Sequence, residues 1–470
     1  MKKLFAAILV LVAIISCKPG GPIIRIESGL LKGVSTETPG VTVFKGIPYA
    51  APPVGDLRWK APQPVRHWNN LKVCDNWGNP AWQTPHTPGG YTPEFFFDGD
   101  PEFNEDCLYL NVWTPAAGEK EAKLPVTLWI HGGGYVAGWG FEPEMDGEEW
   151  AAHGGVLVTF NYRLGLLGFL AHPALSAESP EGVSGNYGML DQIAALKWVK
   201  DNIQAFGGDP ERITIMGQSA GAMSVQTLVT SPLSKDLIAG AIIQSGGGIR
   251  ESQLLGGSPL SIAEESGKEL MDWAGCSTLE QMRALPAEDF PSMATRFRAE
   301  TGKPLVGLTA PVIDNYALSE TFSQAALEGR IANVPYMIGC TLDDMGALAS
   351  GIDRFCLERQ KVGGTAYAYH FDRRLPTDGR PDVLKGAFHS SELWYMFKSL
   401  RFCWRPFVDG DYDLAEQMIT CWTNFAAYGN PNGEKTGPWT PFTEESPLFM
   451  VFKLDDSGAV ASEMEVIASE

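Results

Sequence analysis

Positive charge is scarce in this chain and is nowhere concentrated. Its 470 residues include 36 Lys and Arg against 56 Asp and Glu, which gives a formal net charge of −20. Nucleic-acid binding depends on clustered Lys and Arg that face phosphates, and the sequence has no such cluster. The composition therefore argues against a nucleic-acid partner, although net charge does not identify a substrate.

Metal-ligand patterns and repeats are also missing. The chain has 8 Cys and 7 His, and it contains no CxxC pair or Cys/His cluster with the spacing of a metal site. We therefore expect neither a metal nor a cofactor. No internal repeat or low-complexity run divides the sequence, so residues 23–470 are predicted to form one domain.

Long apolar runs are absent after the N-terminus, and the run at the N-terminus is too short to span a bilayer. Lys2 and Lys3 precede an apolar stretch that ends at Ser16 and Cys17. This pattern is typical of a bacterial lipoprotein signal peptide over residues 1–16, with a lipidated Cys17 and a linker over 17–22. Ordinary signal cleavage near Ser16 is the alternative. The first reading predicts an exported cell-envelope lipoprotein, facing the periplasm or the cell surface, that touches the membrane only through its lipid.

Short β-branched runs alternate with amphipathic segments along most of the chain. Buried strands read as short apolar runs, whereas surface helices show apolar residues at three- and four-residue spacing. Strands that alternate with helices predict an α/β fold with a mostly parallel central sheet. The predicted strands span residues 126–130, 156–161, 213–216, 241–244, 334–338 and 366–371, and the predicted helices span 191–206 and 220–229.

The strongest local motif is a Gly-x-Ser-x-Gly sequence centred on Ser219. It lies between a predicted strand and a predicted helix, where a sharp turn would lift the hydroxyl clear of the sheet. Gly217 and Gly221 supply the small residues that such a turn needs. A chance match in a glycine-rich chain is the alternative, but the strand-turn-helix context favours a nucleophilic serine.

A second motif suits the needs of such a serine. Serine needs a base to take its proton and N–H donors for the oxyanion that forms when it attacks a carbonyl. Residues 131–134, His-Gly-Gly-Gly, follow the predicted strand 126–130 directly. Glycines allow backbone N–H groups to approach a reacting centre closely, so we expect this loop to supply donors. A plain glycine turn is the alternative.

Several further blocks make the chain resemble the type-B carboxylesterase family, which includes cholinesterases and bacterial para-nitrobenzyl esterases. The resemblance covers nearly the whole chain after the N-terminal segment, and it implies the α/β-hydrolase fold and carboxylic ester hydrolysis. The blocks that carry it are 44–50 (FKGIPYA), 105–111 (EDCLYLN), 161–163 (NYR), 185–192 (GNYGMLDQ), 217–221 (GQSAG) and 429–432 (GNPN).

The resemblance implies a Ser-His-Asp triad. The family's acid maps to Asp344, in the segment 339–344 (GCTLDD), with Asp343 as a minor alternative because the loop departs from the usual pattern. The family's histidine maps to His389. His370 is the only other histidine after the acid, and it lies in a strand pattern that suggests a structural role. The order Ser219, Asp344, His389 is the one this fold uses.

The same resemblance assigns the oxyanion donors and some structural markers. The backbone N–H groups of Gly133, Gly134 and Ala220 are implied to hold the oxyanion of a reaction that passes through an acyl-enzyme. Cys74 and Cys107 flank a Pro/Gly-rich stretch and are our disulfide candidates, a pairing that the family also implies. Two structural ion pairs are implied as well, Arg58–Glu105 and Arg163–Asp191. Cys340 and Cys421 lie in apolar runs and are expected to be buried thiols.

Two departures from the family bear on substrate. Gln218 and Phe97 stand where cholinesterases have the Glu and the Trp that favour a quaternary ammonium group, so choline esters are not expected. The interval from Asp344 to His389 is short for this family, which implies a more open acyl side. Small-molecule or glycan-linked esters are the expected substrates, and a feruloyl or acetyl esterase acting on polysaccharide is one alternative. A non-catalytic cholinesterase-like binding protein is another, and oligomeric state cannot be read from the sequence.

Overall fold

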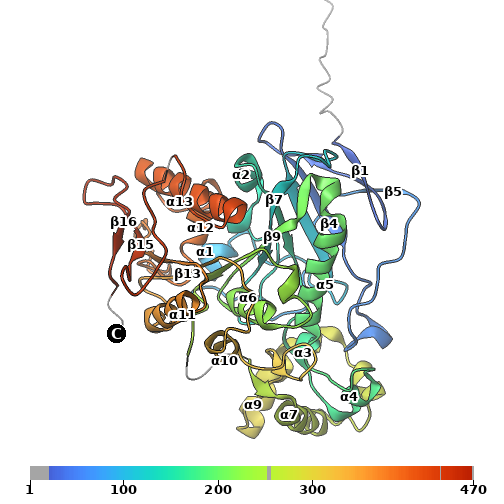
Figure 1. The fold of residues 1–470 in the computed structure, drawn as a ribbon. Helices are drawn as coiled ribbons and strands as arrows, with labels where there is room; N and C mark the ends of the chain where they lie inside the picture. The colour runs from blue at the N-terminus through green and yellow to red at the C-terminus, as the bar shows by residue number, and fades with distance from the viewer. Residues whose placement is uncertain (1–20, 251–255, 435, 468–470) are drawn as a thin grey trace, which may run out of the picture.

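An eleven-stranded sheet forms the centre of the molecule (Figure 1). The computed structural model describes residues 21–250, 256–434 and 436–467, so the predicted signal peptide and Cys17 lie outside the described residues. In spatial order the strands are β16 (Glu463–Glu465), β15 (Phe449–Phe452), β14 (Ala366–Phe371), β13 (Tyr336–Thr341), β10 (Gly240–Gln244), β9 (Gly208–Gln218), β7 (Leu124–Ile130), β8 (Val156–Phe160), β6 (Tyr109–Thr114), β4 (Thr42–Pro48) and β3 (Val34–Ser35).

The middle of this sheet is parallel and its two edges are antiparallel. Every neighbouring pair from β15 across to β8 is parallel, whereas β16, β6, β4 and β3 run against their neighbours. The mostly parallel sheet predicted from the sequence is therefore present. Parallel strands have their carboxyl ends at one edge, and the loops that follow β7, β9 and β13 meet at that edge of the sheet.

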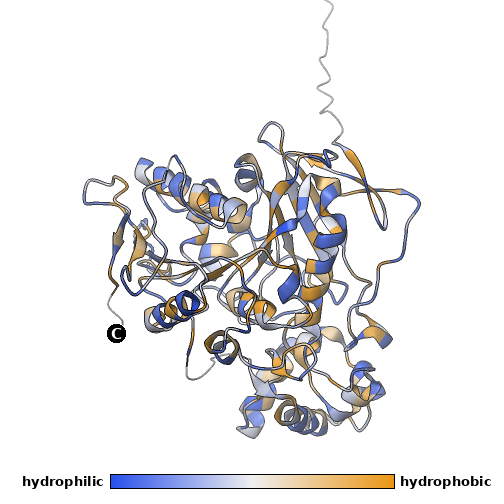
Figure 2. Ribbon diagram, in the orientation of Figure 1, coloured by the Kyte–Doolittle hydropathy of each residue, from blue (hydrophilic) through white to orange (hydrophobic). Residues whose placement is uncertain are grey.

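Helices cover both faces of the sheet, so successive residues of a strand pack into two different hydrophobic cores, one on each face. In β7, Leu128 and Ile130 pack on one face and Trp129 packs on the other. This explains why the central strands read as continuous apolar runs without alternation, and Figure 2 shows hydrophobic residues along them. One face is covered by α5 (Tyr187–Asn202), α6 (Ala220–Thr230), α10 (Phe322–Leu327) and α11 (Ala349–Lys361), and the other by α2 (Glu148–Ala152), α12 (Leu393–Met396) and α13 (Asp409–Tyr428).

The predicted helix over 191–206 differs from the observed one at both ends. It begins earlier, at Tyr187, and α5 ends at Asn202, followed by a 3-10 turn over Ile203–Phe206. Gly207 then takes a left-handed conformation at φ 83°, which a residue without a side chain adopts easily, and it ends the turn. The apolar spacing continued through the 3-10 turn, so the sequence pattern did not show where the α-helix stopped.

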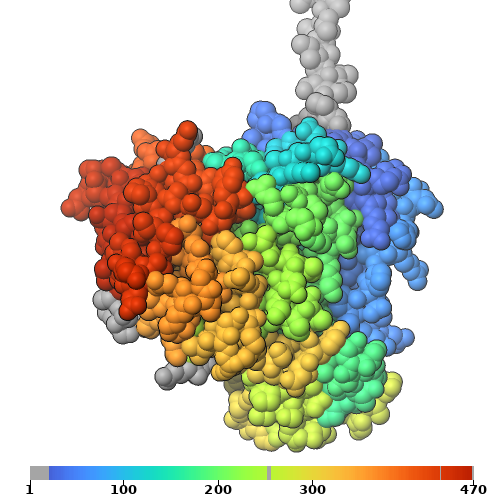
Figure 3. All heavy atoms as spheres, viewed as in Figure 1, coloured from blue at the N-terminus to red at the C-terminus, as the bar shows by residue number. Residues whose placement is uncertain are grey.

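A separate cluster of buried hydrophobic residues lies among the helices at the lower end of the molecule in Figure 1, which the yellow-green segments cover in Figure 3. It joins α3 (Gly165–Phe169), α4 (Pro173–Glu178), α7 (Leu260–Trp273), α8 (Leu279–Arg283) and α9 (Phe290–Thr301), with the strand pair β11 (Ser258–Pro259) and β12 (Val312–Ile313) beside them. A small sheet of β1 (Ile23–Ile26), β2 (Gly29–Lys32) and β5 (Leu71–Val73) lies near the N-terminus. None of the described helices is both long and apolar enough to cross a membrane.

Two ion pairs expected from the family resemblance are present. Arg58 meets Glu105 through two contacts of 2.5 and 2.7 Å. Arg163 meets Asp191 through two contacts of 2.7 Å, and both side chains are buried. The second pair fixes the segment that follows β8 against α5, because the N–H of Arg163 also donates to the same carboxylate at 3.1 Å.

The expected disulfide between Cys74 and Cys107 is absent: both are buried free thiols. Their surroundings differ. The Cys74 sulfur lies 3.8 Å from the carbonyl oxygen of Lys72, whereas Cys107 is fully buried within the electrostatic reach of Asp191 and Arg163. Burial raises the pKa of both thiols, so they are protonated at neutral pH. Cys340 and Cys421 are buried thiols, as expected.

Candidate active site

Ser219 lies in a sharp turn between β9 and α6. Its backbone is at φ 58° and ψ −124°, a conformation that non-glycine residues rarely adopt and that is found at functional sites. The two flanking glycines are required by space. A Cβ at Gly217 would lie 2.4 Å from the carbonyl oxygen of Gly221, and a Cβ at Gly221 would lie 2.0 Å from that of Ile130. The turn presents Ser219 at the N-terminus of α6.

His389 and Asp344 meet at the same edge of the sheet. The Nδ1 atom of His389 lies 2.6 Å from Oδ1 of Asp344, and both side chains are buried. Asp344 is itself fixed, because its Oδ1 accepts the N–H of Met345 at 2.7 Å and its Oδ2 accepts the N–H of Thr341 at 3.1 Å. Burial raises the pKa of Asp344, but hydrogen bonding and charge from His389, with smaller contributions from Ser245 and Thr341, hold it below its usual range. Asp344 is therefore ionised beside His389.

The neighbouring carboxylate, Asp343, has a different environment. Its Oδ2 accepts the N–H of Ala387 at 2.9 Å and lies 3.6 Å from a guanidinium nitrogen of Arg374. Asp343 therefore fastens the loop that carries His389 and does not contact the imidazole. The two adjacent carboxylates thus hold one loop through its backbone and through its histidine.

The glycine loop after β7 presents free backbone donors. Gly133 has φ 91°, and a Cβ there would lie 2.1 Å from the carbonyl oxygen of Ala137, so only glycine fits. Gly134 also has a positive φ, of 62°. The N–H groups of Gly133, Gly134 and Ala220 donate to no acceptor in the described part of the chain. Three unpartnered N–H groups close to Ser219 suit an oxyanion.

His131 precedes this loop but faces the core. Its ring stacks on Tyr162 at 4.4 Å between centroids, and Nδ1 lies 3.0 Å from the carbonyl oxygen of Gly132. Burial lowers the pKa of His131 to about 4, so the imidazole is neutral. His370 is also buried, in β14. Neither histidine lines the cavity that holds Ser219.

These groups open into one cavity of about 490 Å³. Ser219, His389, Asp344, Gly133 and Gly134 all line it. The aromatic run 95–97 contributes only in part, because the first two phenylalanines line the cavity while Phe97 is 38% exposed and does not. The remaining lining includes His86, Tyr91, Trp129, Glu142, Glu144, Met145, Met223, Arg250, Met345, Leu348 and Leu393.

Gln218 makes a contact that the sequence did not predict. Its side-chain Nε2 lies 3.2 Å from Nε2 of His389, while the Ser219 hydroxyl makes no hydrogen bond with any described residue. With Nδ1–H donated to Asp344, the other ring nitrogen is an acceptor, and it takes a hydrogen from the Gln218 amide. Hydrogen bonds between a nucleophile and its base are often loose in unliganded sites.

Glu392 is a second group that the sequence analysis missed. It is fully buried, and neither carboxylate oxygen has a hydrogen-bond partner among the described residues. Burial, and then the charge of Asp344, raises the pKa of Glu392 to about 7. It follows His389 by three residues, but only the fold shows that a carboxyl at this position lies behind the triad.

Comparison with known proteins gives the chain a family. The model of the carboxylesterase family matches residues 20–355 and 348–466. This chain belongs to the carboxylesterase family. The carboxylesterase is 41% identical to the fumonisin B1 esterase of Sphingopyxis macrogoltabida over 90% of this chain and 85% of the relative, and 37% identical to the para-nitrobenzyl esterase of Bacillus subtilis over 90% and 93%.

Solved structures support the same assignment. A thermophilic para-nitrobenzyl esterase aligns with a TM-score of 0.77 at 28% identity, covering 94% of this chain and 97% of that one. A carboxylesterase of Geobacillus stearothermophilus aligns at 0.76 and 30% identity, covering 94% and 98%. The α/β-hydrolase fold and carboxylic ester hydrolysis predicted from the sequence are therefore confirmed.

Proposed function

We propose that this carboxylesterase cleaves esters through a covalent intermediate on Ser219, with His389 as the base and Asp344 as the group that orients it. The observation that carries the proposal is the 2.6 Å contact between His389 Nδ1 and Asp344, in the cavity where Ser219 occupies a strained turn. This contact leaves Nε2 of His389 as the ring nitrogen that can take a proton.

The proposed reaction has two halves. His389 accepts the Ser219 proton as the hydroxyl attacks the ester carbonyl, and Asp344 stabilises the imidazolium. The N–H groups of Gly133 and Gly134, with that of Ala220, hold the tetrahedral oxyanion. The alcohol leaves with the proton from His389, and water then hydrolyses the acyl-enzyme by the same route.

The Gln218 amide has a place in this cycle. It contacts the nitrogen of His389 that must accept the serine proton, so it and Ser219 share one acceptor. In the resting enzyme Gln218 keeps the imidazole in position, and it releases Nε2 when the serine hydroxyl turns toward it. Gln218 is thus a positioning residue for His389.

The adjacent carboxylates Asp343 and Asp344 give a matched test. Asp344→Asn is expected to lower kcat about ten-thousandfold, because the amide no longer holds His389 in the required tautomer. Asp343→Asn makes the same change at the preceding residue and should lower kcat far less, since the described partners of the Asp343 side chain are the N–H of Ala387 and the guanidinium of Arg374. Steady-state hydrolysis of p-nitrophenyl acetate measures both. A crippled Asp343→Asn beside an active Asp344→Asn would contradict the proposed roles.

The cavity lining indicates the chemical class of the natural ester. A cavity of about 490 Å³ with aromatic and methionine side chains suits small-molecule esters, and a feruloyl or acetyl group on a polysaccharide is the second candidate. The aromatic lining from Tyr91, Phe95 and Phe96 is the observation that favours an aromatic acyl group. Comparing p-nitrophenyl esters with feruloylated and acetylated sugars distinguishes these classes.

We also propose that the enzyme is exported and anchored in the cell envelope by a lipid on Cys17. The support is the sequence of the first 17 residues, with its two lysines, short apolar run and terminal Ser-Cys pair. Such an anchor would hold the catalytic domain at the membrane surface, through the short linker to β1.

A further inference from the structure

Arg250 is a cation in the catalytic cavity. It lies in the loop that follows β10, and it lines the same cavity as Ser219 and His389. Among the described residues that line this cavity, no other is a lysine or arginine. The protein carries a formal net charge of −20, so a positive group at this place stands out from its surroundings.

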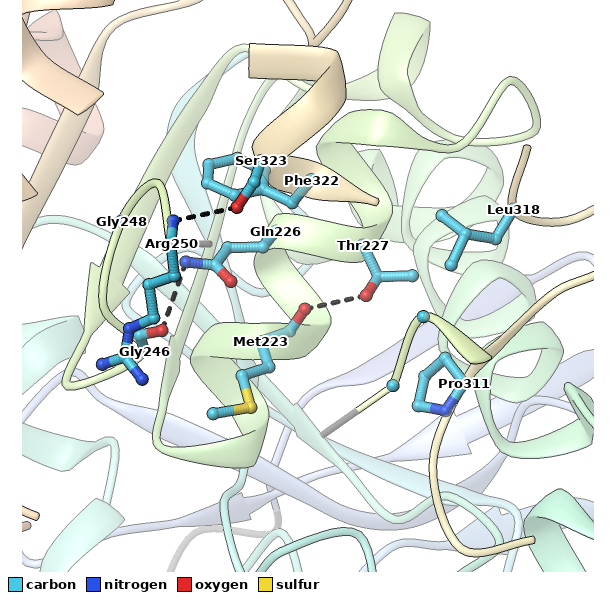
Figure 4. A pocket seen from close by; sticks show the side chains of 12 residues that line it. Met223, Gln226, Thr227, Gly246, Gly248, Arg250, Pro311, Leu318, Phe322 and Ser323 are labelled. Atoms are coloured by element: carbon cyan, nitrogen blue, oxygen red, sulfur yellow. Dashed lines mark hydrogen bonds between the residues drawn. The ribbon is translucent and has the colours of Figure 1, made fainter. Parts of the chain in front are cut away.

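The loop holds Arg250 in a defined position. The backbone N–H of Arg250 donates to Oγ of Ser323 at 3.0 Å, and the N–H of Ile249 donates to the carbonyl oxygen of Gly351 at 2.9 Å. Figure 4 shows the Arg250 side chain running beside Gly246 and Gly248 of its own loop, away from Pro311. Gly247, at φ 68°, makes room for it: a Cβ there would lie 2.4 Å from Nε of Arg250.

The guanidinium of Arg250 has no partner within the part of the chain that the structure describes. It donates no hydrogen bond to a described residue, and no described carboxylate lies within ion-pair distance of it. Burial lowers the pKa of Arg250, with the charge of Asp344 acting against this, but an arginine side chain stays charged. Four other arginines that are buried or partly buried meet carboxylates and show the contrast: Arg58 with Glu105, Arg163 with Asp191, Arg373 with Asp411 and Arg405 with Glu94.

We propose that Arg250 binds a carboxylate of the substrate, so that the preferred substrates are esters that also carry a free carboxylate. The guanidinium fork matches a carboxylate with two parallel hydrogen bonds, and removal from water strengthens such a pair. The proposal rests on the ester hydrolysis proposed above. The free carboxylate can belong to the acyl part or to the alcohol part of the ester.

Asp344, which also lines the cavity, is ionised but is paired with His389, and the two glutamates of the lining do not oppose an anionic substrate strongly. Glu142 and Glu144 are buried, and Oε2 of Glu144 has no hydrogen-bond partner among the described residues. Burial raises the pKa of both, and the charge of Glu142 raises that of Glu144 further. They therefore carry less negative charge than exposed carboxylates would.

The test uses matched pairs of esters. In one arm, the p-nitrophenyl monoester of glutaric acid is compared with p-nitrophenyl valerate, so the carboxylate lies in the acyl part. In the other, the butyrate ester of 4-hydroxybenzoate is compared with phenyl butyrate. In whichever of the two arms places the carboxylate at Arg250, Arg250→Gln should lower the ratio of kcat/KM for the charged ester over the neutral one by roughly 10- to 100-fold. Arg250→Lys should retain part of the ratio.

Controls separate this proposal from the proposed function. Arg354→Gln, at an exposed position on α11, should leave the ratio unchanged in both arms. Added NaCl should lower the wild-type ratio, a measurement that needs no variant. A ratio that Arg250→Gln and salt leave unchanged in both arms would overturn the role of Arg250, as would equal losses on charged and neutral esters. Failure of the wild type on the charged and the neutral esters alike would instead contradict the proposed ester hydrolysis.

Discussion

The single buried carboxyl of Glu392 makes the free energy of unfolding depend on pH. Its pKa of about 7 in the folded protein lies above the unfolded value of about 4.3. Between these values the folded protein holds a proton that the unfolded chain has lost. This carboxyl therefore lowers the free energy of unfolding by about 1.4 kcal/mol per pH unit as the pH rises from about 5 to 7, and the loss levels off above that.

Replacing Glu392 by Gln removes this titration while keeping the shape of the side chain. The free energy of unfolding of the wild type, measured relative to that of Glu392→Gln by urea denaturation, should fall between pH 5 and 7. Glu119→Gln, at an exposed position, should give a curve parallel to that of the wild type. Parallel curves for Glu392→Gln and the wild type would show that Glu392 does not titrate in this range.

The nucleophile and its donors could be predicted from the sequence because each rests on a local requirement. The turn at Ser219 needs glycines at fixed spacing, and the glycine loop follows a strand directly, so both are visible in a short window. Asp344 and His389 came from the family resemblance alone, since 45 residues separate them. Arg250 and Glu392 carried no sequence pattern, because only packing shows that the cation of Arg250 lacks a partner among the described residues and that the carboxyl of Glu392 is buried.

At the scale of elements, the expected strands and the parallel sheet were predictable because buried strands form apolar runs bounded by glycine. The boundaries of the strands were less predictable. β9 begins at Gly208, five residues before the expected start at Ile213, and its first residues are polar, so the apolar pattern did not include them. The prediction of a Cys74–Cys107 disulfide was wrong. It rested on flanking sequence and family resemblance, and neither of these determines where two thiols point.

The short segment between Asp344 and His389 also determines part of the cavity. It contributes Met345, which is 59% exposed, and Leu348, just before α11, to the cavity lining. We expect a shallow dependence of kcat/KM on acyl size, because each buried methylene adds only about 0.8 kcal/mol and the short interval is expected to leave the acyl side more open. Bulky aromatic acyl esters should be accepted.

A series of p-nitrophenyl esters from acetate to a cinnamate-type ester measures this dependence. Phe96→Ala is the informative variant, since Phe96 lines the cavity, whereas Phe97→Ala serves as the control at an exposed neighbour. If Phe95 and Phe96 rebuild the wall, the wild type will prefer one short acyl chain steeply and refuse aromatic esters. That outcome would contradict the open acyl side.

For the whole molecule, the proposed anchor predicts where the enzyme is found. Cys17→Ala should move the protein from the membrane fraction into the soluble fraction, because the variant lacks the thiol to which the proposed lipid is attached. Fractionation followed by immunoblotting measures this, with Cys421→Ala as a control cysteine inside the fold. Mass spectrometry that finds a mature N-terminus without an acylated Cys17 would refute the proposal.

The central claim is that Ser219 is the nucleophile, and its most direct test is the turnover of Ser219→Ala on p-nitrophenyl acetate. Removing one hydroxyl from a turn whose backbone stays fixed should leave the fold intact, as checked by circular dichroism. Loss of a triad serine typically lowers kcat on the order of a millionfold. We predict a loss of that order. A folded Ser219→Ala protein that keeps a tenth of the wild-type kcat or more would contradict the account.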